Sequence, residues 1–252
     1  MGVILLAVLA TPAMSASPFE PANPLYSDGL RLSTGVGGSK SMGNVLSIHR
    51  HDGKDYVIEA QYDSKPYDDS SYWAGRLEWW ENRSAWELEI IHHKLYLMNP
   101  PPDILDFSIS DGYNLVYINR AWALPDYQLA ARVGVGVVVA HPDITFSDRG
   151  RYILKGLPGL RLAGPSVQVA LEQRYPLYEH WYLKSELKLT ASYAKTAISD
   201  RQDEYVVAPD IAIHWVVGIG SQPPKTWDIP GIAMAALPAM FPYTTGQLLG
   251  WK

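Results

Sequence analysis

The chain has 252 residues and 47% hydrophobic content, so it is long enough for one large domain or two small ones with a buried core. Its formal charge of −5 and the lack of a run of Lys and Arg leave no basic surface for nucleic acid, and we expect no nucleic-acid partner. There is no Cys, which excludes disulfides, thiolate metal sites and cysteine nucleophiles.

The aromatic residues are mostly those with a polar atom, because 16 Tyr and 9 Trp stand against 4 Phe. Such amphipathic rings favour a boundary between apolar and aqueous surroundings. The composition therefore indicates a protein that lies at such an interface.

Residues 1–16, MGVILLAVLATPAMSA, form an apolar run that ends in small residues. This pattern predicts a secretory signal peptide with cleavage near Ser15 or Ala16, although no Lys or Arg precedes the apolar run. The alternative is a buried N-terminal strand or helix. No later stretch has eighteen consecutive apolar residues, so the sequence does not predict a transmembrane helix.

Eight segments alternate between apolar and polar residues with the period of two that is typical of strands, and no helical segment of comparable strength separates them. In chain order the predicted strands are residues 29–38, 71–81, 85–97, 111–124, 127–140, 163–175, 178–194 and 205–220. The polar stretch 39–70 is expected to be a long loop, and we expect no metal site at its His49 and His51. Strands without intervening helices predict an all-β fold.

The links between these strands alternate in length. The short links ENR, LPD and PL follow the second, fourth and sixth strands, and much longer links follow the others. Short periplasmic turns and long extracellular loops are typical of outer-membrane barrels, for which eight strands is a permitted number. We therefore predict an eight-stranded antiparallel transmembrane β-barrel over residues 17–220, in the outer membrane of a Gram-negative bacterium. The alternative is a soluble ligand-binding β-barrel whose apolar face turns inward.

The alternation assigns two faces to each strand. In the segment AWELEIIHHKLYL, Trp86, Leu88 and Ile90 share one face with His92 and Lys94, which is the lipid side of the predicted barrel. The other face carries Glu87, Glu89 and His93, and we expect these three residues to join an internal salt-bridge network. For the fourth strand two alternatives remain, because Leu115, Tyr117 and Asn119 compete with Asn114, Val116 and Ile118 for the lipid side.

The third, fourth and fifth predicted strands meet at the extracellular rim. His92 and Lys94 lie near the end of the third, Asp111 and Asn114 near the start of the fourth, and His141 just after the fifth. From this connectivity we expect all five side chains to form one patch at the level of the lipid headgroups. Two imidazoles and a carboxylate are ligands that divalent metals accept, and a Lys can bind phosphate.

Five stretches within residues 71–195 resemble the outer-membrane lipid A oxidase family: ELEIIHHKLYL, FSISDGYNLVYIN, RVGVGVVVAHPDI, AGPSVQVALEQRY and WYLKSELKLTASY. The matching positions are His92 and Lys94; Ser110, Asp111, Gly112 and Asn114; His141 and Pro142; Gly164 and Pro165; and Glu186 and Lys188. The chain departs from the family pattern at Ile91, where Thr is common, and in the order of His141 and Pro142.

The resemblance implies an oxidoreductase that oxidises the proximal glucosamine of lipid A to an aminogluconate unit, using oxygen and a divalent metal. His92, Asp111 and His141 would be the catalytic metal ligands, and Lys94 and Asn114 would bind the lipid A or lipopolysaccharide substrate. The alternative is a non-enzymatic structural or assembly barrel in which these residues only anchor headgroups.

The last segment, residues 221–252, is rich in Pro and Gly and has an apolar middle without a strand pattern. Three alternatives remain for this tail: it docks in the periplasm, fills the lumen, or binds a protein partner.

Overall fold

The computed structural model describes residues 24–67, 71–124, 127–153, 161–178 and 180–222, except for the side chains of Pro24, Asp111 and Tyr178. The predicted signal peptide and nearly all of the predicted tail lie outside these ranges. Within them, no helix has the length and apolar character needed to cross a membrane. Apart from a 3-10 turn at Pro24–Tyr26, the regular structure is β-strand.

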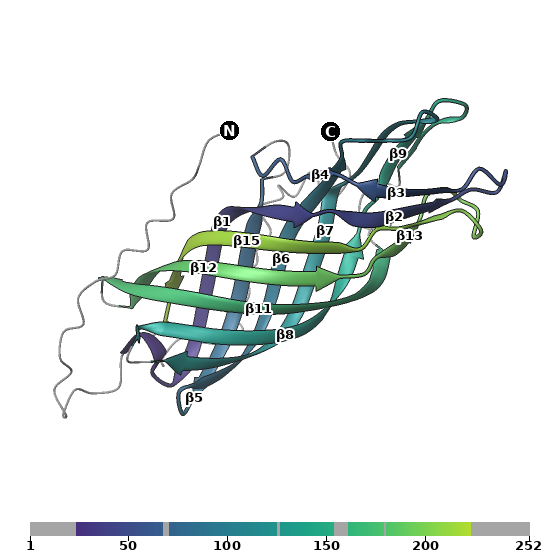
Figure 1. Ribbon diagram of the computed structural model, residues 1–252. Helices are drawn as coiled ribbons and strands as arrows, with labels where there is room; N and C mark the ends of the chain where they lie inside the picture. The colour runs from purple at the N-terminus through teal and green to yellow at the C-terminus, as the bar shows by residue number, and fades with distance from the viewer. Residues whose placement is uncertain (1–23, 68–70, 125–126, 154–160, 179, 223–252) are drawn as a thin grey trace, which may run out of the picture.

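Eight long strands form a closed antiparallel ring in the described part of the chain (Figure 1). In ring order they are β1 (Gly29–Met42), β5 (Trp73–Glu81), β6 (Ser84–Leu97), β7 (Ile104–Leu124), β8 (Leu129–Ala140), β11 (Arg161–Tyr178), β12 (Trp181–Ser192) and β15 (Asp210–Ser221). Each strand pairs with the next, and β15 pairs with β1. The predicted barrel of eight strands is confirmed.

The two ends of the barrel differ. The short-turn end carries the links β5–β6, β7–β8 and β11–β12, together with the first residue of β1 and the last of β15. At the first of these links, Asn82 and Arg83 both have positive φ, as a two-residue hairpin requires. The long-loop end carries the remaining links. In transmembrane barrels short turns face the periplasm and long loops the exterior.

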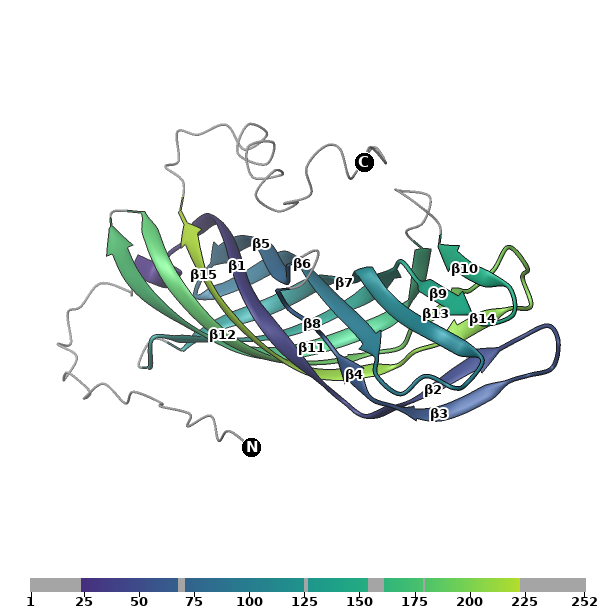
Figure 2. The ribbon, with the colours of Figure 1, turned by 90° about the horizontal axis from the view of Figure 1, so that it is seen from above.

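The long links contain strands that the sequence did not predict. A second sheet has the order β13 (Lys195–Ala197), β14 (Tyr205–Val207), β2 (Asn44–His49), β3 (Tyr56–Ala60), and it projects from the long-loop end (Figure 2). Three shorter strands, β4 (Tyr62–Asp63), β9 (Asp143–Phe146) and β10 (Gly150–Ile153), extend the barrel wall at the same end. The prediction of a loop over 39–70 was therefore wrong, because β2 and β3 bury alternate residues, among them Leu46, Ile48 and Ala60, within an otherwise polar stretch.

Two predicted strand boundaries were also wrong. The fourth barrel strand begins at Ile104 and not near 111, because residues 104–108 pair with β9. The segment 205–220 is two strands in different sheets, β14 and β15, separated at Ala208 and Pro209. Pro209 has no backbone N–H to donate to a ladder, which favours a break there.

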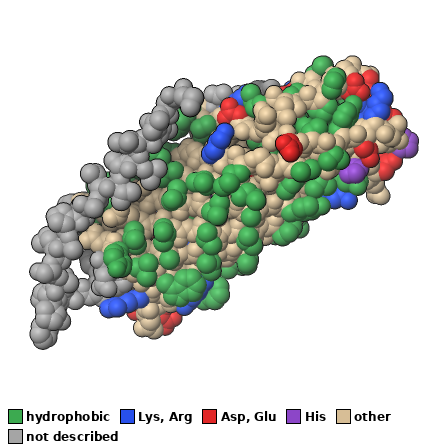
Figure 3. All heavy atoms as spheres, viewed as in Figure 1, with side chains coloured by type: hydrophobic (Ala, Val, Ile, Leu, Met, Phe, Trp, Pro, Cys, Tyr) green, Lys and Arg blue, Asp and Glu red, His purple; other side chains and the backbone are tan. Residues whose placement is uncertain are grey.

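Alternate residues of the barrel strands face outward and are mostly apolar, and toward the short-turn end those between them face inward and are mostly polar. Val135, Leu187 and Ile213 are outward examples, while Gln168 and Lys188 are buried. On the face shown in the space-filling view, hydrophobic side chains are spread over the middle of the barrel wall, and charged side chains lie mainly toward its ends (Figure 3). The fourth strand is now assigned, because Ile118 is 58% exposed and Tyr117 is 1% exposed. Asn114, Val116 and Ile118 therefore face outward.

Paired charges fill the lumen near the short-turn end. Each side chain of this lumen network is fully buried: Arg76, Arg132, Arg174, Lys184 and Lys188 with Glu78, Glu87, Glu89, Glu172 and Glu186. Arg76 bonds Glu186 at 2.8 Å, Arg132 bonds Glu87 at 2.9 Å, and Lys188 bonds Glu89 at 2.7 Å. Glu87 and Glu89 thus join the predicted internal network. His93 also faces inward, 3.0 Å from Asp210.

The lumen becomes apolar toward the long-loop end. There a buried cluster joins barrel residues such as Leu95 and Tyr113 to Leu46 and Ile48 of β2 and Val206 of β14. The second sheet therefore shares a hydrophobic core with the barrel, and burial of these side chains fixes it over the barrel mouth.

Replacing Arg76 tests the lumen network. Arg76→Leu leaves several buried carboxylates without their shared cation, and removal of one partner of a buried pair costs about 3–5 kcal/mol. We expect a loss of this size in the free energy of unfolding, measured by denaturant titration in lipid with Trp fluorescence. Arg201→Leu is the matched control, since Arg201 lies in an exposed pair with Asp203. Equal stability of the two variants would contradict the role assigned to the network.

Acidic pH tests how the β9–β10 hairpin attaches to the second sheet. Arg50 donates a hydrogen bond to Asp148 at 2.7 Å, and this bond holds the pKa of Asp148 below its ordinary value of 3.8. A lowered pKa stabilises the contact above the ordinary value, and the stabilisation is lost as pH falls below it. NMR signals of residues 147–150 should therefore change below pH 3.8. In Asp148→Asn they should already differ at pH 6, and an unchanged Asn variant would count against this contact.

Candidate functional site

The predicted site residues of β6 lie on the outward face, where the apolar wall ends. Trp86 and Leu88 are 61% and 48% exposed, whereas His92 and Lys94, farther along the same face, are 0% and 1% exposed. Both side chains are therefore on the lipid side of the barrel, but neither is directly exposed to lipid.

His92 is held by its cross-strand neighbours. It lies opposite Asn114 of β7 and Trp73 of β5 in the ladder register. Its Nδ1 is 2.8 Å from Asn114 Oδ1, and its ring stacks on Trp73 with 6.0 Å between centroids and 11° between planes. Because an amide oxygen only accepts hydrogen bonds, Nδ1 carries the proton and the lone pair of the neutral ring is on Nε2.

A β-bulge shapes the site at Lys94. His93 pairs with Tyr113 and Leu95 pairs with Ile109, so Lys94 alone lies opposite residues 110–112 of β7. Bulges of this kind redirect side chains and are frequent beside functional sites. The Lys94 ammonium lies 5.7 Å from the centre of the Tyr96 ring, within the range of a cation–π contact.

Gly112, which lies in the bulge, leaves room for the Asn114 side chain and bonds to the backbone of His141. Its φ of +134° is a conformation that side-chain-bearing residues rarely adopt, and a Cβ there would lie 2.0 Å from the Asn114 amide nitrogen. The Gly112 carbonyl accepts a hydrogen bond from the His141 backbone N–H at 3.0 Å. His141 itself is buried, at 5% exposure. Glycine in the SDGYN segment is therefore a steric requirement of this site.

The predicted metal set includes Asp111, whose side chain lies outside the described part of the structure. Among the side chains that are described, no group of three His, Asp or Glu residues is placed to hold a metal ion. The described His92 is suited to such a role, because a metal-binding imidazole usually donates a hydrogen bond from its other ring nitrogen, as His92 does to Asn114.

The adjacent residues His92 and His93 lie on opposite faces of β6. His93 points into the lumen, where its Nδ1 is 2.9 Å from Ser39 Oγ and its Nε2 is 3.0 Å from Asp210 Oδ2. The His214 ring also lies beside it, with 5.1 Å between the two ring centres. Sequence reasoning anticipated an inward His93, but it missed Ser39 and Trp73, since cross-strand partners depend on register.

Comparisons with known proteins concern the fold. The chain matches no protein-family model and no curated protein sequence. Among solved structures it is similar to the outer membrane protein AlkL, with 13% identity, 86% of this chain and 99% of that chain covered and a TM-score of 0.46. It is also similar to Ail of Yersinia pestis, with 10% identity, 77% and 99% coverage and a TM-score of 0.38. For Neisserial surface protein A the identity is 7%, the coverage 77% and 97%, and the TM-score 0.36.

At these values the likenesses carry no information about activity or ligands. The closed ring, the apolar outward face and the charged lumen of the chain itself identify its architecture. The chain is an eight-stranded transmembrane β-barrel of the bacterial outer-membrane type.

Proposed function

We propose that the outward cluster of His92, Lys94, Asn114 and His141, together with Asp111, binds lipid A in the outer leaflet and that the protein is a lipid A oxidase. The observation that carries this proposal is the hydrogen bond between His92 and Asn114 on the lipid side, at the long-loop end of the apolar wall. The cluster thus lies on the lipid side at the level where the headgroup region begins, and a lipid bound there would contact it after displacing the groups that cover it.

The chemistry of the cluster suits a phosphorylated glucosamine. Lys94 supplies a point charge for a lipid A phosphate, and Asn114 both orients His92 and offers amide hydrogen bonds to sugar hydroxyls. The apolar residues Ile90, Val116 and Val137 continue from the cluster along the same outward face. Acyl chains of a lipid bound at the cluster would lie along this wall.

The resemblance stated above supports the oxidation of the proximal glucosamine to an aminogluconate unit. His92, Asp111 and His141 would hold the divalent metal, which would supply activation of dioxygen. Two electrons and two protons would pass from C1 of the proximal sugar, whose hydroxyl is free of phosphate, to dioxygen, which would leave as hydrogen peroxide. Water would then open the lactone to the aminogluconate unit and supply the added oxygen atom. The residues of the chain bind and orient: Lys94 holds the phosphate, Asn114 fixes the His92 tautomer, and Gly112 keeps space for the Asn114 amide.

Mass spectrometry of lipid A tests the proposal. Cells that carry the wild-type chain should contain lipid A with one added oxygen atom, and cells without the gene should lack it. His92→Ala and His141→Ala should abolish the product, because each removes a metal ligand. Lys94→Met should lower conversion by about tenfold, as loss of one hydrogen bond between ions does. His180→Ala is the matched control, since His180 is an exposed residue at the short-turn end.

Heat-modifiable gel migration would show that each variant is folded in the membrane. Identical lipid A from all strains, with all variants folded, would refute the oxidase. The cluster would then be a headgroup anchor of a structural barrel.

Gly112→Ala tests the steric argument separately. The added methyl group would displace the Asn114 amide and break its bond to His92. The ¹⁵N signals of the His92 ring in labelled protein should shift, and oxidation should fall with them. Gly53→Ala is the control, because Gly53 also has positive φ but a Cβ there meets nothing within 4 Å. An unchanged His92 spectrum in Gly112→Ala would contradict the assigned role of Gly112.

A further inference from the structure

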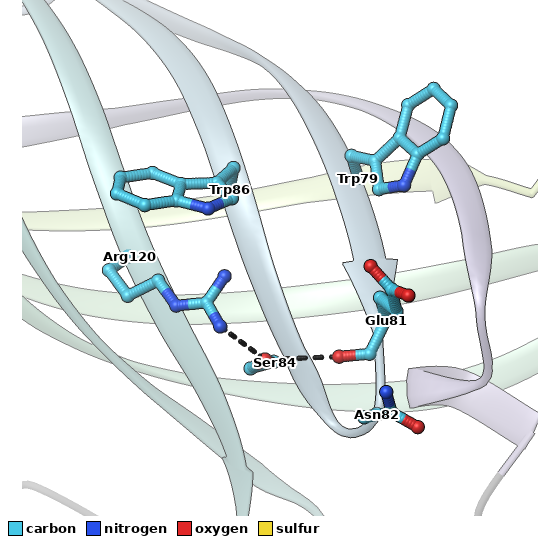
Figure 4. Close-up of a pocket in the computed structure, with 6 residues that line it drawn as sticks. All are labelled: Trp79, Glu81, Asn82, Ser84, Trp86 and Arg120. Carbon is cyan, nitrogen blue, oxygen red and sulfur yellow. Dashed lines mark hydrogen bonds between the residues drawn. The ribbon is translucent and has the colours of Figure 1, made fainter.

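A hollow of about 410 Å³ lies on the outward wall at the short-turn end, remote from the cluster at the other end. It is lined by Trp79, Glu81, Asn82, Ser84, Trp86 and Arg120 (Figure 4). Trp79 and Trp86 are directly opposite each other in the β5–β6 ladder, and both are more than half exposed. Glu81 and Ser84 flank the tight turn, so the hollow is open both to the apolar wall and to the turn.

The depth of the hollow is that of a membrane–water interface. The outward pair above it along the same strands is Leu77 and Leu88, which belong to the apolar wall. Below it is the polar β5–β6 turn. Exposed Trp residues at such a level are typical of the headgroup region, here on the periplasmic side.

One cation and one anion line this hollow, and they do not form an ion pair with each other. The Arg120 guanidinium lies over the Trp86 ring, 5.1 Å from its centre, and donates a hydrogen bond to Ser84 Oγ at 2.5 Å. These contacts orient Arg120 without neutralising its charge. Neither Arg120 nor Glu81 has an ion-pair partner among the residues that the structure describes.

We propose that this hollow binds the headgroup of a phosphoethanolamine-bearing phospholipid of the periplasmic leaflet. The planar guanidinium of Arg120 matches a phosphate, which it can contact through two N–H groups. The Glu81 carboxylate accepts hydrogen bonds from a primary ammonium, which a quaternary choline cannot donate. Trp79 and Trp86 flank the headgroup, and the acyl chains lie along the wall that begins at Leu77 and Leu88.

The test titrates short-chain phosphatidylethanolamine into the folded protein in a non-ionic detergent and follows the indole and guanidinium ¹⁵N NMR signals. Signals of Trp79, Trp86 and Arg120 should shift and saturate. Trp181, an exposed Trp at the same end of the barrel on β12, is the internal control and should not shift. Arg120→Gln should weaken binding by about tenfold, the usual effect of losing one hydrogen bond between ions.

Two further arms separate the ligand chemistry. The wild-type protein should bind phosphatidylcholine more weakly than phosphatidylethanolamine. The Glu81→Gln variant should bind the two lipids equally. Inorganic phosphate should not saturate the same signals at the same concentration. Equal shifts at Trp181, equal binding of the two lipids by the wild-type protein, or equal binding of free phosphate would each overturn the proposal. These outcomes are independent of the lipid A experiment, because the two sites lie at opposite ends of the wall.

Discussion

The lumen network of ten charged side chains is the constraint on which the rest of this structure depends. Ions taken out of water are tolerated only when they are paired, and here the five cations and five carboxylates come from five different strands, β5, β6, β8, β11 and β12. The pairs form only if those strands close in one register. A slip of one residue would turn the charges toward lipid and the apolar residues into the lumen. Closure, register and the polarity of both faces are thus consequences of one requirement.

The same requirement makes the exceptions on the outer face informative. Because the inward residues carry the charge network, the polar outward residues lie outside it. His92, Lys94, Asn114 and His141 are such exceptions at the long-loop end, and Arg120 with Glu81 at the short-turn end. The bulge opposite Lys94 departs from regular pairing at this place. The two polar sites thus mark the two interfaces between which the apolar wall extends.

The second sheet lies over the long-loop end of the barrel and shares its apolar core. Leu46, Ile48 and Val206 continue the apolar cluster that begins inside the barrel at Leu95 and Tyr113. Polar pairs such as Arg50 with Asp148 and Arg149 with Glu204 join the strands around it. The lumen therefore changes along its axis from paired charges to packed hydrophobic side chains. Because the lumen is filled in this way, substrates of the proposed enzyme would approach from the lipid side.

The sequence by itself determined the eight barrel strands, their inward and outward faces except on β7, and the ends with short and long links. These features follow from local rules, the period of two and the length of each turn. It also placed His92, Asn114 and His141 near one rim by connectivity. Only the tertiary structure decided the outward face of β7, the second sheet, the stacking of Trp73 on His92 and the need for glycine at 112. Each of these features depends on the register between strands that are distant in sequence. Such pairing is set by the burial of side chains from several strands at once, and no single segment of the sequence encodes it.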